Sequence, residues 1–253
     1  MQDRFQVGLF LKLAACFVSF AVIFTSVLII CSSPLLQENR DTAAYLADAV
    51  HTEPKGLPVI VIDPGHGGED GGATSDSGIC EKDINLSIAL YLSEICRASG
   101  LEYRLTRSED VMLYEDGKPS RKMQDLSNRL KLTEGGNCIF ISIHQNKFPQ
   151  SSCRGTQVYY SPNDPDSEKL ALSIQHGVRD ALQPYNTRNI KKAGSEIFVL
   201  DRAQVPAVLV ECGFLSNKND LDLLMSKDYR KKLACVLYAA ILGCLSDDYE
   251  TEG

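Results

Sequence analysis

The fold is decided by residues 59–68, which read VIVIDPGHGG. The four β-branched residues at the start of this stretch predict a short buried strand. His66 follows that strand inside a glycine-rich turn, where glycines permit tight turns and a close approach of the backbone. A histidine that follows a buried strand in this way is a candidate functional residue.

Outward from this stretch, strand-like and helix-like runs alternate through residues 57–246. Apolar residues at helical spacing predict four helices, around residues 84–95, 123–130, 170–182 and 229–244. Short apolar runs predict further strands at 103–106, 138–143, 156–160, 196–200 and 207–210. This alternation predicts a layered α/β domain with a largely parallel sheet. In such sheets ligands bind outside the carboxyl ends of the strands.

The composition supports a globular body and argues against one class of partner. The chain has 253 residues, of which 44% are hydrophobic, and a net charge of -7. Residues 1–33 hold Arg4 and Lys12 against Asp3, a net +1, so the remaining residues carry -8. Nucleic-acid binding needs clustered Lys and Arg to neutralise phosphates. We therefore expect no nucleic-acid partner.

The amino-terminal segment predicts a membrane anchor. Residues 13–31 contain no charged residue, and a spanning helix needs about 20 apolar residues. Arg4 and Lys12 precede the run, as in a signal peptide or a signal anchor that begins in the cytoplasm. A cleaved signal peptide is the alternative, but its apolar region is about 7–15 residues long and ends in small residues.

We therefore interpret residues 1–33 as an uncleaved signal anchor that leaves the body of the chain outside the cytoplasm. The rest of the chain divides into a linker at 34–56, a globular domain at 57–246 and an acidic tail at 247–253.

Four side chains with metal-binding or acid–base chemistry stand beside the predicted strands and helices: His66, Glu81, His144 and Glu211. Two imidazoles and one carboxylate form a catalytic zinc set that leaves a position open for water. A further carboxylate can take the proton of that water. Glu211 follows an apolar run directly, where a carboxylate is costly to bury unless it is paired or metal-bound. The sequence thus offers ligands for one Zn²⁺ and one spare base.

Each of these residues also has a simpler explanation when it is taken alone. His66 can be only a turn residue, and His144 only a satisfied buried histidine. Glu81 can be a charge that the helix dipole favours near a helix start. The functional interpretation therefore depends on the four residues as a set.

The chain resembles the zinc-dependent N-acetylmuramoyl-L-alanine amidases of bacterial cell walls. Five segments carry the resemblance in the family's order: 62–68, 81–86, 105–107, 142–146 and 206–214. The resemblance implies that His66, Glu81 and His144 bind zinc and that Glu211 is the general base toward a zinc-activated water. It also implies a three-layer domain with a six-stranded sheet flanked by helices.

The resemblance further implies a reaction and a polymer substrate. The reaction is hydrolysis of the amide between muramic acid and L-alanine in peptidoglycan. Two segments, 148–150 and 155–160, look most similar to the amidase that helps to form muramic lactam in endospore cortex, which implies a role in cortex maturation. Two alternatives stay open, a zinc peptidase that cuts elsewhere in the stem peptide and a non-catalytic peptidoglycan-binding module.

The sequence departs from the family pattern after the second histidine. Gln145-Asn146-Lys147 stands where the family usually has Ala-Asn-Ala, and we expect Lys147 to alter the groove for the stem peptide. Some relatives insert an inhibitory helix that plugs the zinc site. Only ten residues separate His144 from Gly155, which is too few for that helix. We therefore expect an open site. Control of the activity would then come from where and when the protein is made, or from an activating partner.

Three further residues are candidates for substrate binding: Arg107, Arg129 and Asn146. A guanidinium presents a planar fork of donors that suits carboxylate or sugar oxygens. A salt bridge within the protein is the alternative for both arginines. Cys212 adjoins Glu211, and because neighbours in a strand point to opposite faces, we expect a buried thiol that is not a metal ligand.

Overall fold

The computed structural model describes residues 56–117 and 119–250, with the side chains of the last helix described up to Leu245. The predicted signal anchor and all of the predicted linker except Gly56 lie outside these residues. Within the described part of the chain, no helix is long and apolar enough to cross a membrane.

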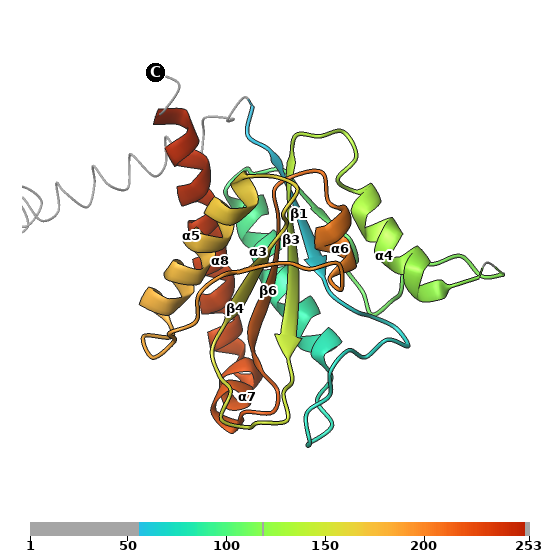
Figure 1. Ribbon diagram of the computed structural model, residues 1–253, viewed down its shortest axis with the longest axis vertical. Helices are drawn as coiled ribbons and strands as arrows, with labels where there is room; N and C mark the ends of the chain where they lie inside the picture. The colour runs from blue at the N-terminus through green and yellow to red at the C-terminus, as the bar shows by residue number, and fades with distance from the viewer. Residues whose placement is uncertain (1–55, 118, 251–253) are drawn as a thin grey trace, which may run out of the picture. The chain divides into compact units, whose positions relative to one another are not determined.

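Six strands form a single sheet in the order β2-β1-β3-β6-β4-β5. Figure 1 labels β1, β3, β6 and β4 at the centre of the domain. They span Val59–Pro64 (β1), Tyr103–Leu105 (β2), Cys138–Asn146 (β3), Gln157–Tyr160 (β4), Lys191–Lys192 (β5) and Ala207–Phe214 (β6). The strands β2, β1, β3 and β6 run parallel to one another. The strand β4 is antiparallel to β6, and β5 is parallel to β4. The predicted six-stranded, largely parallel sheet is therefore confirmed. Its antiparallel pairing is that of β4 with β6.

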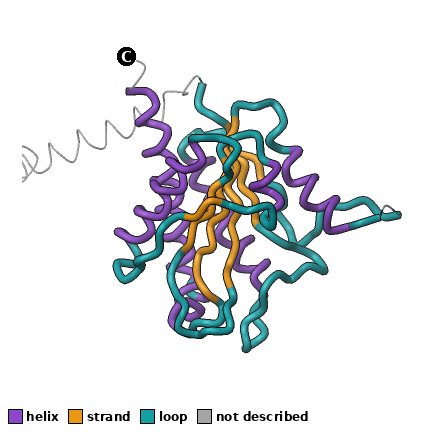
Figure 2. The backbone as a smooth tube through the Cα atoms, in the orientation of Figure 1, coloured by secondary structure: helices purple, strands orange, loops and turns teal. Residues whose placement is uncertain are grey.

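Helices cover both faces of the sheet and make a three-layer α/β domain. They span Glu81–Ala98 (α3), Arg121–Lys131 (α4), Asp166–Ala181 (α5), Phe198–Arg202 (α6), Lys218–Met225 (α7) and Lys227–Glu250 (α8). The helices α3, α5, α7 and α8 share one apolar core with the sheet, and α4 and α6 share the other. Figure 2 shows the strands as the central layer between these helices.

Because side chains alternate along a strand, each strand points some residues toward the core of α3, α5, α7 and α8 and the others toward α4 and α6. In β6, Val208, Val210 and Cys212 point into the core beneath α3, α5 and α8, while Leu209 points toward α4 and α6. Because side chains alternate along a strand, Glu211 shares the face of Leu209. The same alternation in β3 puts His144 on that face too. Cys212 is buried in the opposite core, as expected.

One predicted strand is wrong, and two elements were not predicted. Residues 196–200 were expected as a strand, but the chain there turns into α6, where the Leu200 and Asp201 N–H groups both donate to the Ile197 carbonyl. The four-residue apolar run at 197–200 has no periodicity long enough to distinguish the two structures. The two-residue β5 is too short to leave a pattern. Helix α7 does carry a signal, because the Asn217 side chain caps it by accepting from the Asp220 N–H.

The end of the sheet at which the described chain begins lies opposite the end that carries the functional candidates. Gly56, the first described residue, lies at the amino end of the sheet, where its carbonyl accepts a 3.5 Å hydrogen bond from the Asn137 side chain. Residues 247–250 of the predicted acidic tail continue α8. The carboxyl ends of β1, β3 and β6 lie at the other end, where the functional candidates stand.

Candidate active site

The strand register brings two of the functional candidates side by side. His144 and Glu211 are Cα partners across the parallel pair β3 and β6. Both strands extend further than the sequence predicted, so both residues lie inside strands and not directly after them. This location fixes their backbones through the sheet hydrogen bonds, and their shared face points them toward the same space.

His66 sits in the turn after β1 in a backbone conformation that is rare for a residue with a side chain. Its φ is 62°, in the left-handed region, which persists only when the surroundings determine it. The ring is held at both nitrogens. Nδ1 lies 2.9 Å from Asp70 Oδ2, and Nε2 lies 3.4 Å from Glu81 Oε1.

Glu81 opens helix α3 and is only 3% exposed. Its Oε1 accepts from His144 Nδ1 at 2.8 Å and from the Gln145 backbone N–H at 3.0 Å, and its Oε2 accepts from the Ala73 N–H at 2.8 Å. Burial acts to raise the pKa of Glu81, but the hydrogen bonds and charges of His144 and His66 outweigh it and lower the pKa far below 4.5. Glu81 is therefore a permanently ionised carboxylate between two histidines.

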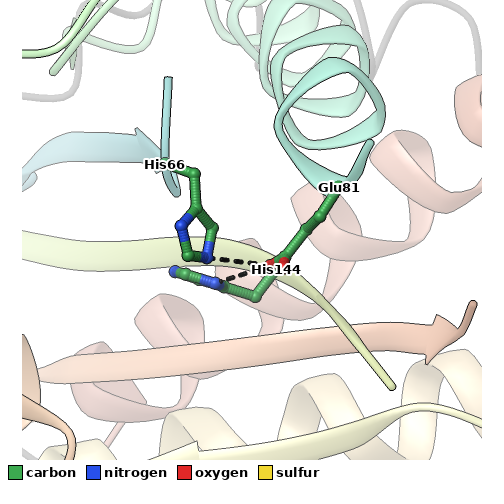
Figure 3. Close-up of side chains that lie close together, drawn as sticks. All are labelled: His66, Glu81 and His144. Carbon is green, nitrogen blue, oxygen red and sulfur yellow. Dashed lines mark hydrogen bonds and ion pairs between the residues drawn. The ribbon is translucent and has the colours of Figure 1, made fainter. Parts of the chain in front are cut away.

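Three atoms from separate elements converge on one point, as Figure 3 shows. His66 Nε2, Glu81 Oε1 and His144 Nδ1 face one another, and these three residues form a group whose ligand atoms lie within 4.8 Å. The two imidazole rings meet nearly edge to face, with centroids 5.0 Å apart. Two nitrogens and one carboxylate oxygen match the donor set of a catalytic zinc site with one open position. The residues present therefore fit a zinc ion.

Glu211 differs from Glu81 because its carboxylate finds no hydrogen-bond partner among the described residues. Its Oε2 is buried, and no hydrogen-bonding group of the described residues reaches it. Burial raises the pKa of Glu211 to about 7, with the nearby His144 lowering it and Glu81 raising it. A carboxyl group whose pKa lies near neutrality can exchange a proton at working pH, which is the property of a general base.

A cleft of about 280 Å³ opens over these residues. His66, His144 and Glu211 line one side of it, and Leu126, Ile197, Phe198 and Val199 of the α4 and α6 region line the other. Lys122 and Glu196 add charges of opposite sign. Residues 147–156, between β3 and β4, contain no helix, in agreement with the expectation that this connection is too short for an inhibitory helix.

Arg129 lines the cleft but has no donor left for a ligand. It is 1% exposed, and Nε and Nη2 donate to Asp125 at 2.9 and 3.2 Å. Its Nη1 donates to Asp63 Oδ1 at 2.7 Å and to the Pro64 carbonyl at 2.9 Å, and Nη2 donates to the His66 carbonyl at 2.7 Å. These contacts use all five N–H groups of the guanidinium.

Arg107 is engaged in a similar way. It is 3% exposed, and its Nε donates to the Pro64 carbonyl at 2.9 Å. Its Nη2 donates to the carbonyls of Gly65 and Lys82, and its Nη1 to that of Glu109. We therefore propose that both arginines hold the backbone of the histidine turn, in place of the substrate-binding role considered from the sequence.

The residues that depart from the family pattern also make contacts within the protein. Gln145 Nε2 donates to Asn85 Oδ1 at 3.1 Å. Lys147 Nζ donates to the Thr74 carbonyl at 2.6 Å and lies 3.2 Å from Asp76, so it fastens the loop before α3. Asn146 ends β3, where its carbonyl accepts from the Leu215 N–H, and it does not line the cleft. Its substrate-binding role stays a prediction.

Three acidic residues near the site were missed from the sequence. Asp63 lies in β1 directly before its last residue, is 1% exposed and accepts from Thr106 and Ser142 at 2.6 Å each, besides Arg129. Asp125 is spaced four residues before Arg129, a helical pairing that the sequence does offer. Asp70 lies beside the His66 ring in the glycine-rich turn, where nothing in the sequence distinguishes it from an ordinary turn residue.

Comparison with known proteins places this arrangement in a family. The family model described as N-acetylmuramoyl-L-alanine amidase matches residues 60–243. The germination-specific N-acetylmuramoyl-L-alanine amidase of Bacillus subtilis is 35% identical over 188 residues, which are 73% of this chain and 78% of that protein. The uncharacterized protein YqiI of the same organism is 32% identical over 184 residues, 72% of this chain and 82% of that protein.

Solved structures give the same result at the level of the fold. The CwlD amidase from Clostridioides difficile, in complex with the GerS lipoprotein, superposes with a TM-score of 0.71 and 37% identity. The match covers 75% of this chain and 98% of that one. The catalytic domain of CwlV from Bacillus (Paenibacillus) polymyxa superposes with a TM-score of 0.63 and 31% identity, covering 75% and 99%. The chain therefore belongs to the N-acetylmuramoyl-L-alanine amidase family.

Proposed function

We propose that this amidase is zinc-dependent and that it hydrolyses the amide between muramic acid and L-alanine in peptidoglycan, with Glu211 as the general base. The observation that carries the proposal is the juxtaposition of the His66, Glu81 and His144 donor atoms with Glu211 Oε2, a buried oxygen without a hydrogen-bond partner in the part of the chain that the structure describes. Family membership supplies the bond that is cut.

The chain's own residues have distinct tasks in this reaction. Zn²⁺ held by the two histidines and Glu81 would polarise a carbonyl and acidify a water. Glu211 Oε2 takes the proton of the attacking water, and the same carboxyl group then delivers it to the leaving amine of L-alanine. The apolar side chains of Ile197 and Phe198 line the same cleft, and an apolar lining strengthens electrostatic interactions by lowering the local dielectric constant.

Digestion of purified peptidoglycan tests the reaction directly. Mass spectrometry is expected to find released stem peptides that begin with a free L-alanine amino group, and glycan strands whose muramic acid has lost its peptide. Removing the metal with a chelator should stop the release, and adding Zn²⁺ should restore it. Peptides shortened within the stem would instead indicate a peptidase, and an intact polymer at full zinc occupancy would indicate a binding module.

We also propose a setting for the enzyme, the spore cortex outside the cytoplasm, with residues 1–33 as a membrane anchor. The similarity to a germination-specific amidase supports the cortex role, and the complex of CwlD with a lipoprotein supports a protein partner. Fractionation of sporulating cells is expected to recover the full-length chain with membranes. Recovery of a shortened chain from the soluble fraction would mean that the segment is cleaved.

A further inference from the structure

We propose that Asp70 is a positioning residue that orients His66 for the metal, fixing its Nδ1 as the protonated nitrogen and leaving Nε2 for zinc. The inference rests on the proposed zinc dependence. The two ring nitrogens have different neighbours: Nδ1 lies 2.9 Å from Asp70 Oδ2, while Nε2 faces Glu81 Oε1. A metal-binding histidine commonly donates its other N–H to a carboxylate, which fixes the ring's tautomer and orientation.

The carboxylate of Asp70 is itself held before any metal binds. The backbone groups of Gly67 and Asp70 exchange two hydrogen bonds of 2.9 and 3.0 Å, which close the turn and bring the Asp70 side chain under the histidine ring. Its Oδ1 accepts from the Gly72 N–H at 3.2 Å, and its Oδ2 also accepts from Lys122 Nζ. Asp70 therefore has contacts on three sides, and one of them is the His66 ring.

The turn needs its glycines to reach this geometry. Gly67 and Gly72 both have positive φ, at 141° and 66°. A Cβ on Gly72 would lie 2.6 Å from Glu81 Oε2 and 2.7 Å from His66 Cδ2. The glycine-rich turn thus packs against two metal-ligand candidates while it presents the Asp70 carboxylate to one of them.

The chain offers a matched control in the neighbouring residue. Glu69 carries the same charge one position earlier, but it is exposed and pairs with Arg121 at 3.0 Å, without contact to His66. Asp70→Asn and Glu69→Gln each remove one negative charge from the same turn. A general electrostatic effect of the turn on a nearby cation would therefore appear in both variants, and an effect of orientation only in Asp70→Asn.

Zinc affinity measured by competition with a chromophoric chelator is expected to fall about 10- to 100-fold in Asp70→Asn, the loss typical of such supporting partners. It should stay within about twofold of wild type in Glu69→Gln. Equal affinities in the wild type and both variants, or equal losses in both variants, would overturn the inference. Thermal unfolding of the metal-free proteins checks that both variants are folded.

A second measurement does not depend on affinity or activity. In the zinc-loaded protein with ¹⁵N-labelled histidine, the His66 Nδ1–H should appear as a low-field proton that exchanges slowly, because it is hydrogen-bonded to a carboxylate. In Asp70→Asn this proton should move upfield and exchange faster. A spectrum in which zinc is bound through His66 Nδ1 would overturn the inference. A wild-type protein that binds no zinc would instead contradict the proposed function itself.

Discussion

Replacing Glu211 by glutamine is expected to lower kcat by about 10²- to 10⁴-fold, the usual contribution of a general base. The amide keeps the size of the carboxyl group but cannot accept the proton of the attacking water. Glu211 contacts no other polar group through Oε2, so the substitution breaks no hydrogen bond of that oxygen. The measurement is release of stem peptides by zinc-loaded enzyme, with zinc content determined on the same sample. Near-normal turnover at full zinc occupancy would contradict the assignment.

The same variant has an opposite effect on stability, which separates catalysis from folding. The pKa of Glu211 is raised from 4.5 to about 7 by burial, so the folded metal-free state binds more protons than the unfolded state between these values. Stability is therefore lost as pH rises through this window, and the loss is complete above pH 7. At pH 8 the metal-free Glu211→Gln protein should be more stable than wild type, by an amount on the order of 3 kcal/mol. The difference should vanish near pH 4.

Replacing Gly65 by alanine is expected to remove zinc binding from a protein that still folds. A Cβ at this position would lie 2.2 Å from His144 Nε2 and 2.3 Å from its Cε1. The ring must move, because the opposing atoms belong to a side chain, whereas the Gly65 backbone is held by β3 through the 3.0 Å hydrogen bond from the Gly65 N–H to the Ile143 carbonyl. Loss of a ligand should weaken zinc binding by more than the roughly 100-fold that a supporting partner contributes.

Gly71 is the matched control for this substitution. It lies in the same glycine-rich segment, and a Cβ there would meet only Cys80, at the ordinary contact distance of 3.6 Å. Gly71→Ala should therefore keep zinc affinity near that of wild type in the same chelator competition. Unchanged zinc affinity in Gly65→Ala would show that His144 is not needed as a ligand in the observed orientation.

The part of the fold that could be predicted from the sequence is the part with long or repeated patterns. The buried strand before His66 leaves a run of β-branched residues, and the helix from Glu81 leaves an apolar period; both elements are present in the structure. Helix α6 leaves no such signal, because the four-residue apolar run at 197–200 suits a strand or a helix equally and its tertiary surroundings decide.

The candidate site was predictable in its members but not in its supports. The four candidate residues stand next to predicted strands and helices, and two of them, His144 and Glu211, directly follow apolar runs, where a polar side chain is costly to bury without a partner. This signal is present in a single sequence. The role of Arg129 depends on Asp63, which is 66 residues away in the chain and becomes a partner only when β1 and α4 pack together. Asp70 could not be singled out, because only the folded turn brings its carboxylate to the His66 ring.

The proposed anchor would give the position of Gly56 a mechanical consequence. A pull from an anchored segment would enter the domain next to β1, and β1 is bonded on both sides, to β2 and to β3. Such a load is shared as shear across two rows of hydrogen bonds, about 20 Å of strand away from the catalytic end. The turn that holds His66 carries none of it directly. A domain built in this way can be held at one pole while the opposite pole works on a stiff and moving polymer.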